Sequence, residues 1–243
     1  MQDDIPRSGY PQEQVLRIFK GEGLAGLLIT MEGVEGSGKS TQIQRLSARL
    51  RDCGAPLVVS KEPGGTPLCQ ELRQLLLEPH HSGETWAPKA ELLLFYADRA
   101  QHLANFIQPA MEEGKVVLLD RFDDSTRAYQ GALGVSDSVM DRLAEVVLGR
   151  LKPHLTLLLD MDPAQSLERV QARNGADKDF RETRFDEAAL EFHRRVRSRF
   201  LAVAQKEAHR IAVIPAQEAP EKVEEAIWGR VAPLMRIAGY RVE

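Results

Sequence analysis

Short apolar runs alternate with longer amphipathic stretches along most of the chain. The apolar runs predict buried strands at 27–32, 56–60, 116–120, 155–160 and 211–214. Apolar residues at helical spacing predict helices at 39–52, 66–77, 86–112, 137–149, 163–173, 187–208 and 219–237. Strands and helices that alternate in this way build a mainly parallel sheet with helices on both faces. We therefore expect a three-layer α/β fold around a five-stranded parallel sheet.

Residues 1–25 do not share this pattern, because they are polar and interrupted by proline and glycine. They predict a flexible N-terminal extension rather than a part of the core. The remainder, 26–243, is long enough for one α/β domain of ordinary size. We expect a single domain there.

Composition excludes several classes of protein. Of the 243 residues, 43% are hydrophobic and 28% charged, so we expect a packed core rather than global disorder. A net charge of −4 argues against bulk binding to nucleic acid. No apolar run approaches the roughly 20 residues of a membrane span, and the N-terminus lacks the apolar centre of a signal peptide. Cys53 and Cys69 lack metal-ligand spacing and are typical of thiols in a reducing compartment. Together these features predict a cytoplasmic protein that acts on neither membranes nor nucleic acid.

The segment between the first predicted strand and helix carries the strongest chemical signal. It reads Gly33-Val34-Glu35-Gly36-Ser37-Gly38-Lys39-Ser40, followed by Thr41, and fits the phosphate-binding pattern G-x-x-x-x-G-K-[ST]. The glycines let main-chain N–H groups surround a polyphosphate, the lysine reaches its terminal phosphates, and the Ser40 hydroxyl is a ligand for Mg²⁺. The following helix would present its N-terminus to the phosphates. The motif predicts nucleotide binding but does not identify the reaction.

Two more candidate loops follow predicted strands, where ligands bind in sheets of this kind. Asp120 and Arg121 end the third strand, where an acid can hold Mg²⁺ and an arginine offers a fork of donors to a phosphate. The alternative is an Asp120 that caps the next helix beside a solvated Arg121. Glu62-Pro63-Gly64-Gly65-Thr66 follows the second strand; its glycines permit close backbone approach, although Pro-Gly-Gly is also a generic turn. Thr66 is expected to cap the next helix.

Phe95 and Arg99 are four residues apart on a predicted helix and therefore share one face. A flat ring beside a guanidinium is one way to hold a nucleobase. The pattern alone favours the alternative, a core phenylalanine beside a solvated arginine, and it places Leu93 and Tyr96 in the core as well.

Arginines and acids are interleaved from 173 to 199, which is typical of a charged helical face in water. Arg173 and Arg184 have a sharper interpretation as residues of a lid over transferring phosphates, with Arg184 in an irregular stretch before a helix.

Together these segments resemble bacterial thymidylate kinases over residues 27–237. The matching pieces are 29–40, 62–66, 94–99, Asp120-Arg121-Phe122 with Ser125-Thr126 and 128–131, and 184–197. One such motif is weak evidence of a family resemblance, but five motifs in the family's order are specific evidence. The resemblance implies a P-loop kinase fold with a lid at 173–186, phosphorylation of dTMP by ATP in dTTP biosynthesis, Mg²⁺ as cofactor, and a homodimer that uses the helix predicted at 86–112.

The roles of the donor site are carried over from the family residue by residue. The resemblance implies that 33–41 and Arg173 bind ATP, with Arg173 on the adenine. It makes Lys39, Arg121 and the lid residue Arg184 catalytic, and Ser40 and Asp120 the metal ligands.

The acceptor site is implied in the same way. Glu35 would sense the 3′-hydroxyl of dTMP, Glu62 would shape the site near the metal, and Arg121 with Arg73 would bind the phosphate. The residues implied to surround the base and sugar are Phe95, Arg99, Thr126, Tyr129 and Gln130, with Phe95 stacked on thymine and Arg99 bonded to its O4.

The chain departs from the family pattern at three places. Phe122 stands where tyrosine is usual, Lys61 stands where arginine is usual, and the lid reads Thr183-Arg184-Phe185-Asp186. Arg181 therefore competes with Arg184 for the lid role. The alternative functions are a kinase for another nucleotide or nucleoside, a nucleotide switch and a pure binding module. The chain lacks the Asn-Lys-x-Asp motif of small GTPases, which disfavours the switch.

Overall fold

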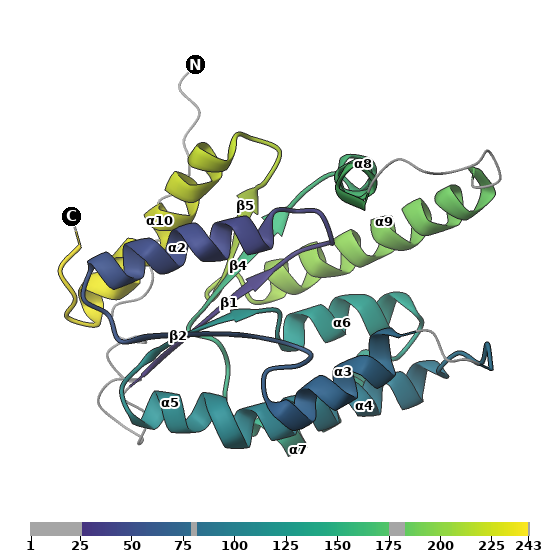
Figure 1. Ribbon diagram of the computed structural model, residues 1–243, viewed down its shortest axis with the longest axis horizontal. Coiled ribbons are helices and arrows are strands. Elements are labelled where there is room, and N and C mark those ends of the chain that lie inside the picture. Colours follow the sequence, from purple (N-terminus) through teal and green to yellow (C-terminus); the bar gives the residue numbers. More distant parts are fainter. Residues whose placement is uncertain (1–25, 79–81, 175–182, 243) are drawn as a thin grey trace.

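The computed structural model describes residues 26–78, 82–174 and 183–242 (Figure 1), and the side chains at 173–174 and 183–188 lie outside this description. The predicted extension 1–25 and the middle of the predicted lid, with Arg181, fall outside the described residues. The prediction of one domain with a lid therefore stays a prediction.

Five parallel strands form one sheet, as predicted. They are β1 (Leu27–Glu32), β2 (Leu57–Lys61), β3 (Val116–Asp120), β4 (Leu155–Asp160) and β5 (Ile211–Pro215), in the order β2-β3-β1-β4-β5. The register pairs Leu27 with Val116 and Ile29 with Leu155, so the carboxyl ends of β1, β3 and β4 meet at one edge. Loops that follow these strands are thereby brought together, where ligands bind in such sheets.

The helices of the described segments lie between and after these strands. They are α2 (Lys39–Asp52), α3 (Pro67–Leu77), α4 (Pro88–His102), the π-helical segment η1 (Leu103–Ile107), α5 (Gln108–Glu112), α6 (Asp123–Ala132), α7 (Asp137–Leu148), α8 (Pro163–Asn174), α9 (Thr183–Lys206) and α10 (Pro220–Ile237). Thr66 caps α3, as predicted, by accepting the Cys69 N–H.

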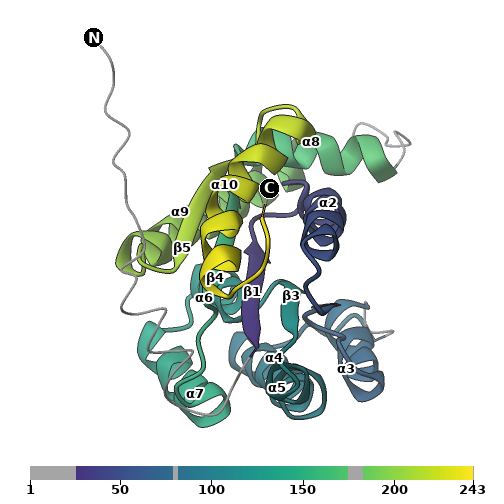
Figure 2. The same cartoon turned by 90° about the vertical axis from the view of Figure 1, so that its left-hand side faces the viewer.

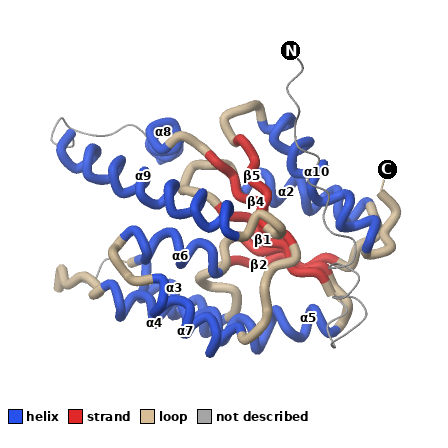
Figure 3. Tube along the Cα trace, turned by 180° about the vertical axis from the view of Figure 1, so that it is seen from behind, coloured by secondary structure: helices blue, strands red, loops and turns tan. Residues whose placement is uncertain are grey.

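Helices cover both faces of the sheet. Helices α2 and α10 lie on one face, and α5 and α7 lie on the other side of the sheet (Figures 1 and 2). Helix α9 runs beside α6 (Figure 3), and the Arg199 guanidinium bonds to the Arg127 main-chain oxygen between them. The predicted three-layer arrangement is confirmed.

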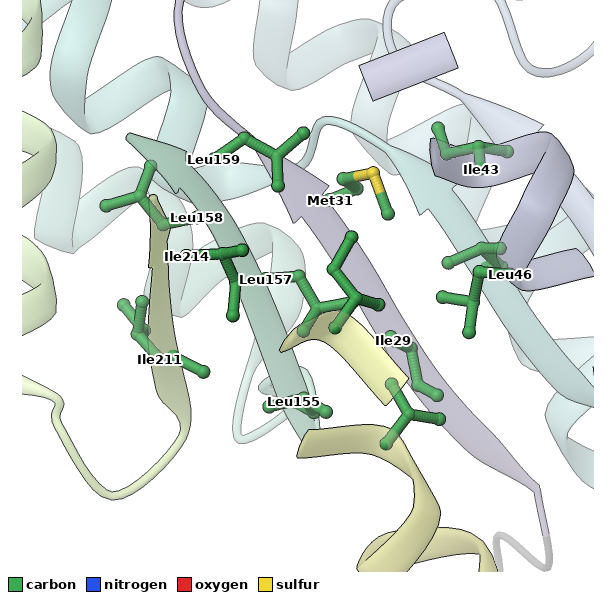
Figure 4. Close-up of a cluster of buried hydrophobic side chains, with 14 of the residues drawn as sticks. Ile29, Met31, Ile43, Leu46, Leu155, Leu157, Leu158, Leu159, Ile211 and Ile214 are labelled. Carbon is green, nitrogen blue, oxygen red and sulfur yellow. The ribbon is translucent and has the colours of Figure 1, made fainter. Parts of the chain in front are cut away.

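Strand β1 is buried on both faces, so its residues alternate between two cores. Ile29 and Met31 pack toward Leu46 of α2 (Figure 4), whereas Leu28 packs with Ile107 and Met111 on the opposite side. Each such side chain contributes roughly 1.5–3 kcal/mol when removed from water. Burial from both sides holds β1, and with it the loop that follows Glu32.

The predicted helix 86–112 is wrong as one uniform helix. It begins at Pro88, changes to π-helical spacing at Leu103–Ile107 and returns to α-helical spacing at Gln108. Pro109 has no N–H for the carbonyl four residues earlier and would crowd that carbonyl, so a wider turn before it relieves the clash.

Helix α6 was absent from the predicted helices. Its buried positions include Asp124, Thr126 and Gln130, so no apolar stripe marks it in the sequence. Two further predictions are also wrong. Arg184 lies in the first turn of α9 rather than in an irregular stretch, and Leu93 is 56% exposed rather than part of the core.

Candidate active site

The phosphate-binding motif 33–40, here called the P-loop, connects β1 to α2 at the carboxyl edge of the sheet. Its Gly36 and Gly38 have φ values of 76° and 93°, which residues with side chains rarely adopt. A Cβ at Gly36 would also lie 2.4 Å from the main-chain oxygen of Ser166. The curve of the loop depends on these glycines, and it leaves Ser40 and Thr41 exposed at the start of α2.

Lys39 lies folded against its own loop. Its Nζ donates to the main-chain oxygens of Gly33, at 3.1 Å, and Val34, at 2.9 Å. Burial and then the positive charge of Arg121 lower the pKa of Lys39 to about 7. A polyphosphate in the loop would favour the charged lysine, because a nearby negative charge stabilises an ammonium group.

Arg121 has a left-handed backbone, with φ of 70°, and its guanidinium is held by the P-loop and by helix α6. Nη1 donates to the Gly33 oxygen, at 3.1 Å, and to the Ser125 hydroxyl, at 2.9 Å. The group also lies over the Tyr129 ring, 5.0 Å from its centroid. The alternative of a solvated Arg121 is wrong. Asp120 is not a helix cap either, because α6 begins at Asp123 with Phe122 as its N-cap.

Asp120 and Ser40 could hold a divalent ion with the help of phosphates. Oδ1 of Asp120 is buried and has no hydrogen-bond partner among the described residues. No group of three or more His, Cys, Asp or Glu residues in the described segments could hold a metal alone. Mg²⁺ commonly takes one or two protein oxygens and completes its shell with phosphate and water, so these donors fit it.

Arg99 of α4 is almost fully buried, at 1% exposure. Its Nε donates to Glu62 Oε2 at 2.8 Å, Nη2 donates to Thr126 Oγ1 at 3.0 Å, and Nη1 lies 3.3 Å from Asp123 Oδ1. Burial lowers the pKa of Arg99, but the carboxylates of Glu62 and then Asp123 outweigh it and hold this pKa above its ordinary value. The solvated Arg99 that the pattern favoured is wrong.

Three side chains surround the space beside Arg99. Phe95 is half-buried and lines the cleft instead of the core. Tyr129 meets the Phe192 ring edge-on, with centroids 6.3 Å apart, and the Gln130 amide donates to Glu91 at 3.1 Å. An aromatic face beside hydrogen-bonding groups suits a flat, polar base.

These parts line one cleft of about 750 Å³. The predicted site residues that line it are Glu35, Gly36, Gly38, Lys39, Ser40, Thr41, Glu62, Arg73, Phe95, Arg99, Asp120, Arg121, Thr126, Tyr129 and Gln130. Gly33, Val34 and Ser37 are buried in the P-loop behind them. The backbones of Arg173 and Arg184 belong to α8 and α9, and their side chains are outside the description.

The sequence interpretation assigned no role to Glu32, which ends β1 at the same edge. Its carboxyl accepts the Phe122 N–H at 2.7 Å and the Ser125 hydroxyl proton. Burial and then the negative charge of Asp124 raise the pKa of Glu32 to about 8. The rule that ligands bind beyond the carboxyl ends of parallel strands would have selected this residue.

Arg169 of α8 also lines the cleft and was not predicted. Arg169 lies four residues before Arg173 in the sequence, and this helical spacing could have indicated it. Further along, Arg197 of α9 makes a two-point bond to Asp160 at the end of β4, at 2.6 and 2.8 Å. The solvated-face interpretation therefore does not hold for Arg197, which ties α9 to the sheet.

Comparison with known proteins agrees with this geometry. The family model described as thymidylate kinase matches residues 31–227. A thymidylate kinase of Syntrophotalea carbinolica is 43% identical over 212 residues, which cover 87% of this chain and 97% of that protein. One of Solidesulfovibrio magneticus is 46% identical over 211 residues, covering 86% of this chain and 100% of that protein. The crystal structure of thymidylate kinase from Ehrlichia chaffeensis matches with a TM-score of 0.69 and 30% identity, over 85% of this chain and 98% of that one.

Proposed function

Because the chain belongs to the thymidylate kinase family, we propose that its cleft binds ATP and dTMP together and transfers the γ-phosphoryl group of ATP to dTMP, giving dTDP and ADP. One observation carries the proposal. Arg121 bonds both to Gly33 of the P-loop and to Tyr129 of α6, so its guanidinium lies where the nucleotide loop meets the aromatic pocket.

The P-loop side is the donor site. Residues 33–41 bind the phosphates of ATP, Arg173 packs on its adenine, and Lys39 and Arg184 neutralise charge that develops during transfer. Lys39 supports this assignment because it lies at the cleft wall with a pKa that a polyphosphate would raise.

The α4 and α6 side is the acceptor site. Phe95 stacks on the base, Arg99 bonds its O4, and Thr126 and Gln130 meet its edge. Tyr129 crowds the 2′ position and favours a deoxyribose. Arg121 and Arg73 bind the dTMP phosphate, while Glu35 contacts the 3′-hydroxyl and Glu62 shapes the site near the metal. All of these residues line the cleft.

The transfer step needs no side-chain nucleophile. An ionised oxygen of the dTMP phosphate attacks the γ-phosphorus in line, the bond to the β-phosphate oxygen breaks, and ADP leaves with that electron pair. The protein contributes by aligning the two phosphates and by neutralising charge through Lys39, Arg121 and Arg184. When bound, Mg²⁺ held by Ser40 and Asp120 would neutralise further phosphate charge.

An acceptor panel tests the proposed reaction. The full chain is assayed with ATP and Mg²⁺ against dTMP, dCMP, AMP and thymidine, with ADP release as the readout. We expect dTMP to be phosphorylated far faster than the others. Equal rates with dCMP and AMP would overturn the specificity, a preference for thymidine would indicate a nucleoside kinase, and hydrolysis without any acceptor would indicate a nucleotide switch.

The role of Glu35 has its own test. Glu35 is exposed in the P-loop and lines the cleft. Glu35→Gln is assayed with dTMP and with its 3′-deoxy analogue. The proposed contact predicts a loss with dTMP and little loss with the analogue, whereas equal losses would place Glu35 elsewhere.

We also propose that the protein is a cytoplasmic homodimer. Exposed apolar side chains on α3, α4 and α7 support an interface there, among them Leu75, Leu93 and Val146. Sedimentation of the full chain tests this, and a monomer at micromolar concentration would overturn it. Cys69 is a buried thiol, which supports a reducing compartment. None of the described helices is long and apolar enough to cross a membrane.

A further inference from the structure

His102 ends α4 as a fully buried side chain, and both of its ring nitrogens have polar partners. Nδ1 lies 3.1 Å from Glu62 Oε1, and Nε2 lies 2.8 Å from the Ser60 hydroxyl. An ionised carboxylate only accepts hydrogen bonds, so Nδ1 must carry the proton that points to Glu62. On the opposite side of the ring, Nε2 forms its hydrogen bond with the Ser60 hydroxyl. The contact with Ser60 holds the imidazole ring in place, and the ring in turn holds Oε1 of Glu62.

The other oxygen of Glu62 holds Arg99. Oε2 accepts the Arg99 Nε–H at 2.8 Å, and the remaining guanidinium nitrogens reach Asp123 and Thr126. A guanidinium has five N–H groups in a rigid plane. These three contacts therefore orient the plane and leave two N–H groups for a ligand. Because Arg99 lines the cleft and His102 does not contribute to its lining, the histidine lies one step behind the binding surface.

The surrounding backbone is shaped around the imidazole. A Cβ at Gly65 would lie 2.2 Å from His102 Nε2, so the ring reaches Ser60 and Glu62 only because residue 65 is glycine. On its other side the ring stacks on the ring of Phe106, which belongs to the π-helical segment that begins at Leu103. The two ring centroids are 5.4 Å apart, and the ring planes are inclined by 27°. The second glycine of the Glu-Pro-Gly-Gly-Thr loop thus has a specific purpose beyond the turn.

We propose that His102 is a positioning residue for recognition of the acceptor base, acting through Glu62 on the orientation of the Arg99 guanidinium. The inference rests on the proposed contact between Arg99 and O4 of dTMP. If His102 merely filled space, an apolar side chain of similar volume would replace it without changing base recognition. If it positions Glu62, its loss leaves one carboxylate oxygen without its donor, and Glu62 and Arg99 can rotate together.

Three variants separate these possibilities. His102→Leu removes both hydrogen bonds and keeps an apolar filling. His102→Asn retains a donor near the position of Nδ1 and is the conservative rescue. Ser60→Ala removes only the hydrogen bond to Nε2 of His102, which is the one farthest from Arg99, and it disturbs packing least. His154→Leu is the matched control, because His154 accepts the Leu28 N–H at 3.0 Å at the opposite end of the sheet.

Each protein is assayed for KM and kcat with dTMP and with a dTMP analogue that lacks O4. We expect the wild type to prefer dTMP over the analogue by roughly tenfold or more in kcat/KM, as a lost hydrogen bond to a charged group predicts. In His102→Leu this preference should shrink several-fold through a higher KM for dTMP, with KM for ATP unchanged. His102→Asn should restore most of the preference for dTMP. Ser60→Ala should show a preference between those of His102→Leu and the wild type, and His154→Leu should match the wild type.

The outcomes distinguish the inference from the function on which it rests. An undiminished preference for O4 in His102→Leu or, should that variant not fold, in Ser60→Ala would overturn the positioning role and leave the proposed kinase intact. If the wild type phosphorylated dTMP and the O4-less analogue equally well, the result would contradict both the proposed contact between Arg99 and O4 and the inference about His102. A wild type with no dTMP kinase activity would overturn the proposed function itself.

Discussion

The Arg121 guanidinium donates to the main-chain oxygen of Gly33 across 3.1 Å, so the arginine after β3 is bonded to the first residue of the P-loop. Its backbone lies in the left-handed region, at φ 70°, which costs a residue with a side chain of the order of 1 kcal/mol or more. The surrounding contacts with Ser125 and Tyr129 hold it there. The two loops that are to carry donor and acceptor phosphates are therefore one connected unit.

Replacement of Arg121 by lysine should reduce kcat by about 100-fold or more, the usual cost of losing one preorganised charged donor. Lysine keeps the charge but offers no planar fork, so it cannot bond to the loop and to a phosphate at the same time. Steady-state assays with saturating ATP and dTMP measure the effect. Arg45→Lys is the control, because Arg45 forms its ion pairs with Glu221 and Glu224 of α10, away from the cleft. Retention of more than a third of kcat in Arg121→Lys would contradict the assignment.

Gly65→Ala should destabilise the protein, because its Cβ would lie 2.2 Å from the buried His102 ring. Overpacking of this kind typically costs about 1–3 kcal/mol of unfolding free energy. Urea denaturation measures the loss, and the double variant Gly65→Ala/His102→Ala should cost less than the two single changes added together. The control is Gly229→Ala in α10, where no atom lies within 4 Å of the added Cβ and alanine favours the helix. Additive losses in the double variant would show that the two sites are not in contact.

Arg210→Ala should cost roughly 3–5 kcal/mol of unfolding free energy, because it leaves a buried carboxylate without its partner. Arg210 donates to both oxygens of Asp124, at 2.7 Å each, and both side chains are buried. Removing the two charges together, as Asp124→Leu/Arg210→Met, should cost less than the single change. Thermal and urea unfolding give the comparison. A single variant as stable as the wild type would mean that water or another group compensates Asp124.

The sequence predicted the strands, the P-loop and most of the cleft for identifiable reasons. Apolar runs such as 116–120 are buried on both faces, so their pattern is unambiguous. Parallel strands bring their carboxyl ends to one edge, which is why residues as distant along the chain as Lys39 and Asp120 line a common cleft. Local spacing and one topological rule suffice for that result.

The parts that were missed depend on contacts between distant residues. Helix α6 has polar buried positions, such as Thr126 and Gln130, whose partners Arg99 and Glu91 belong to α4. Burial of Arg99 follows from Glu62 and Asp123, which no helical pattern can reveal. Periodicity records which side chains avoid water, and it does not record which buried charges find partners.

Glu32→Gln should change how stability depends on pH. Burial and then the charge of Asp124 raise the pKa of Glu32 to about 8 in the folded protein, above the value of 4.5 for a free side chain. Between these values the folded protein holds a proton that the unfolded chain releases. The contribution of Glu32 to stability is therefore fully present below pH 4.5 and is lost as pH rises through 8, with a slope of up to about 1.4 kcal/mol per pH unit.

Glutamine cannot titrate, so Glu32→Gln should lose this slope and gain stability relative to the wild type as pH rises from 5 to 8. Urea unfolding at intervals across that range measures the difference, with the exposed Glu84→Gln as the control. The absolute stability of the variant can be lower, because its single amide oxygen must serve both the Phe122 N–H and the Ser125 hydroxyl. The pH slope is independent of that loss. Parallel curves for the variant and the wild type would mean that Glu32 is ionised in the folded protein, and that the charges of Arg121 and its neighbours outweigh its burial.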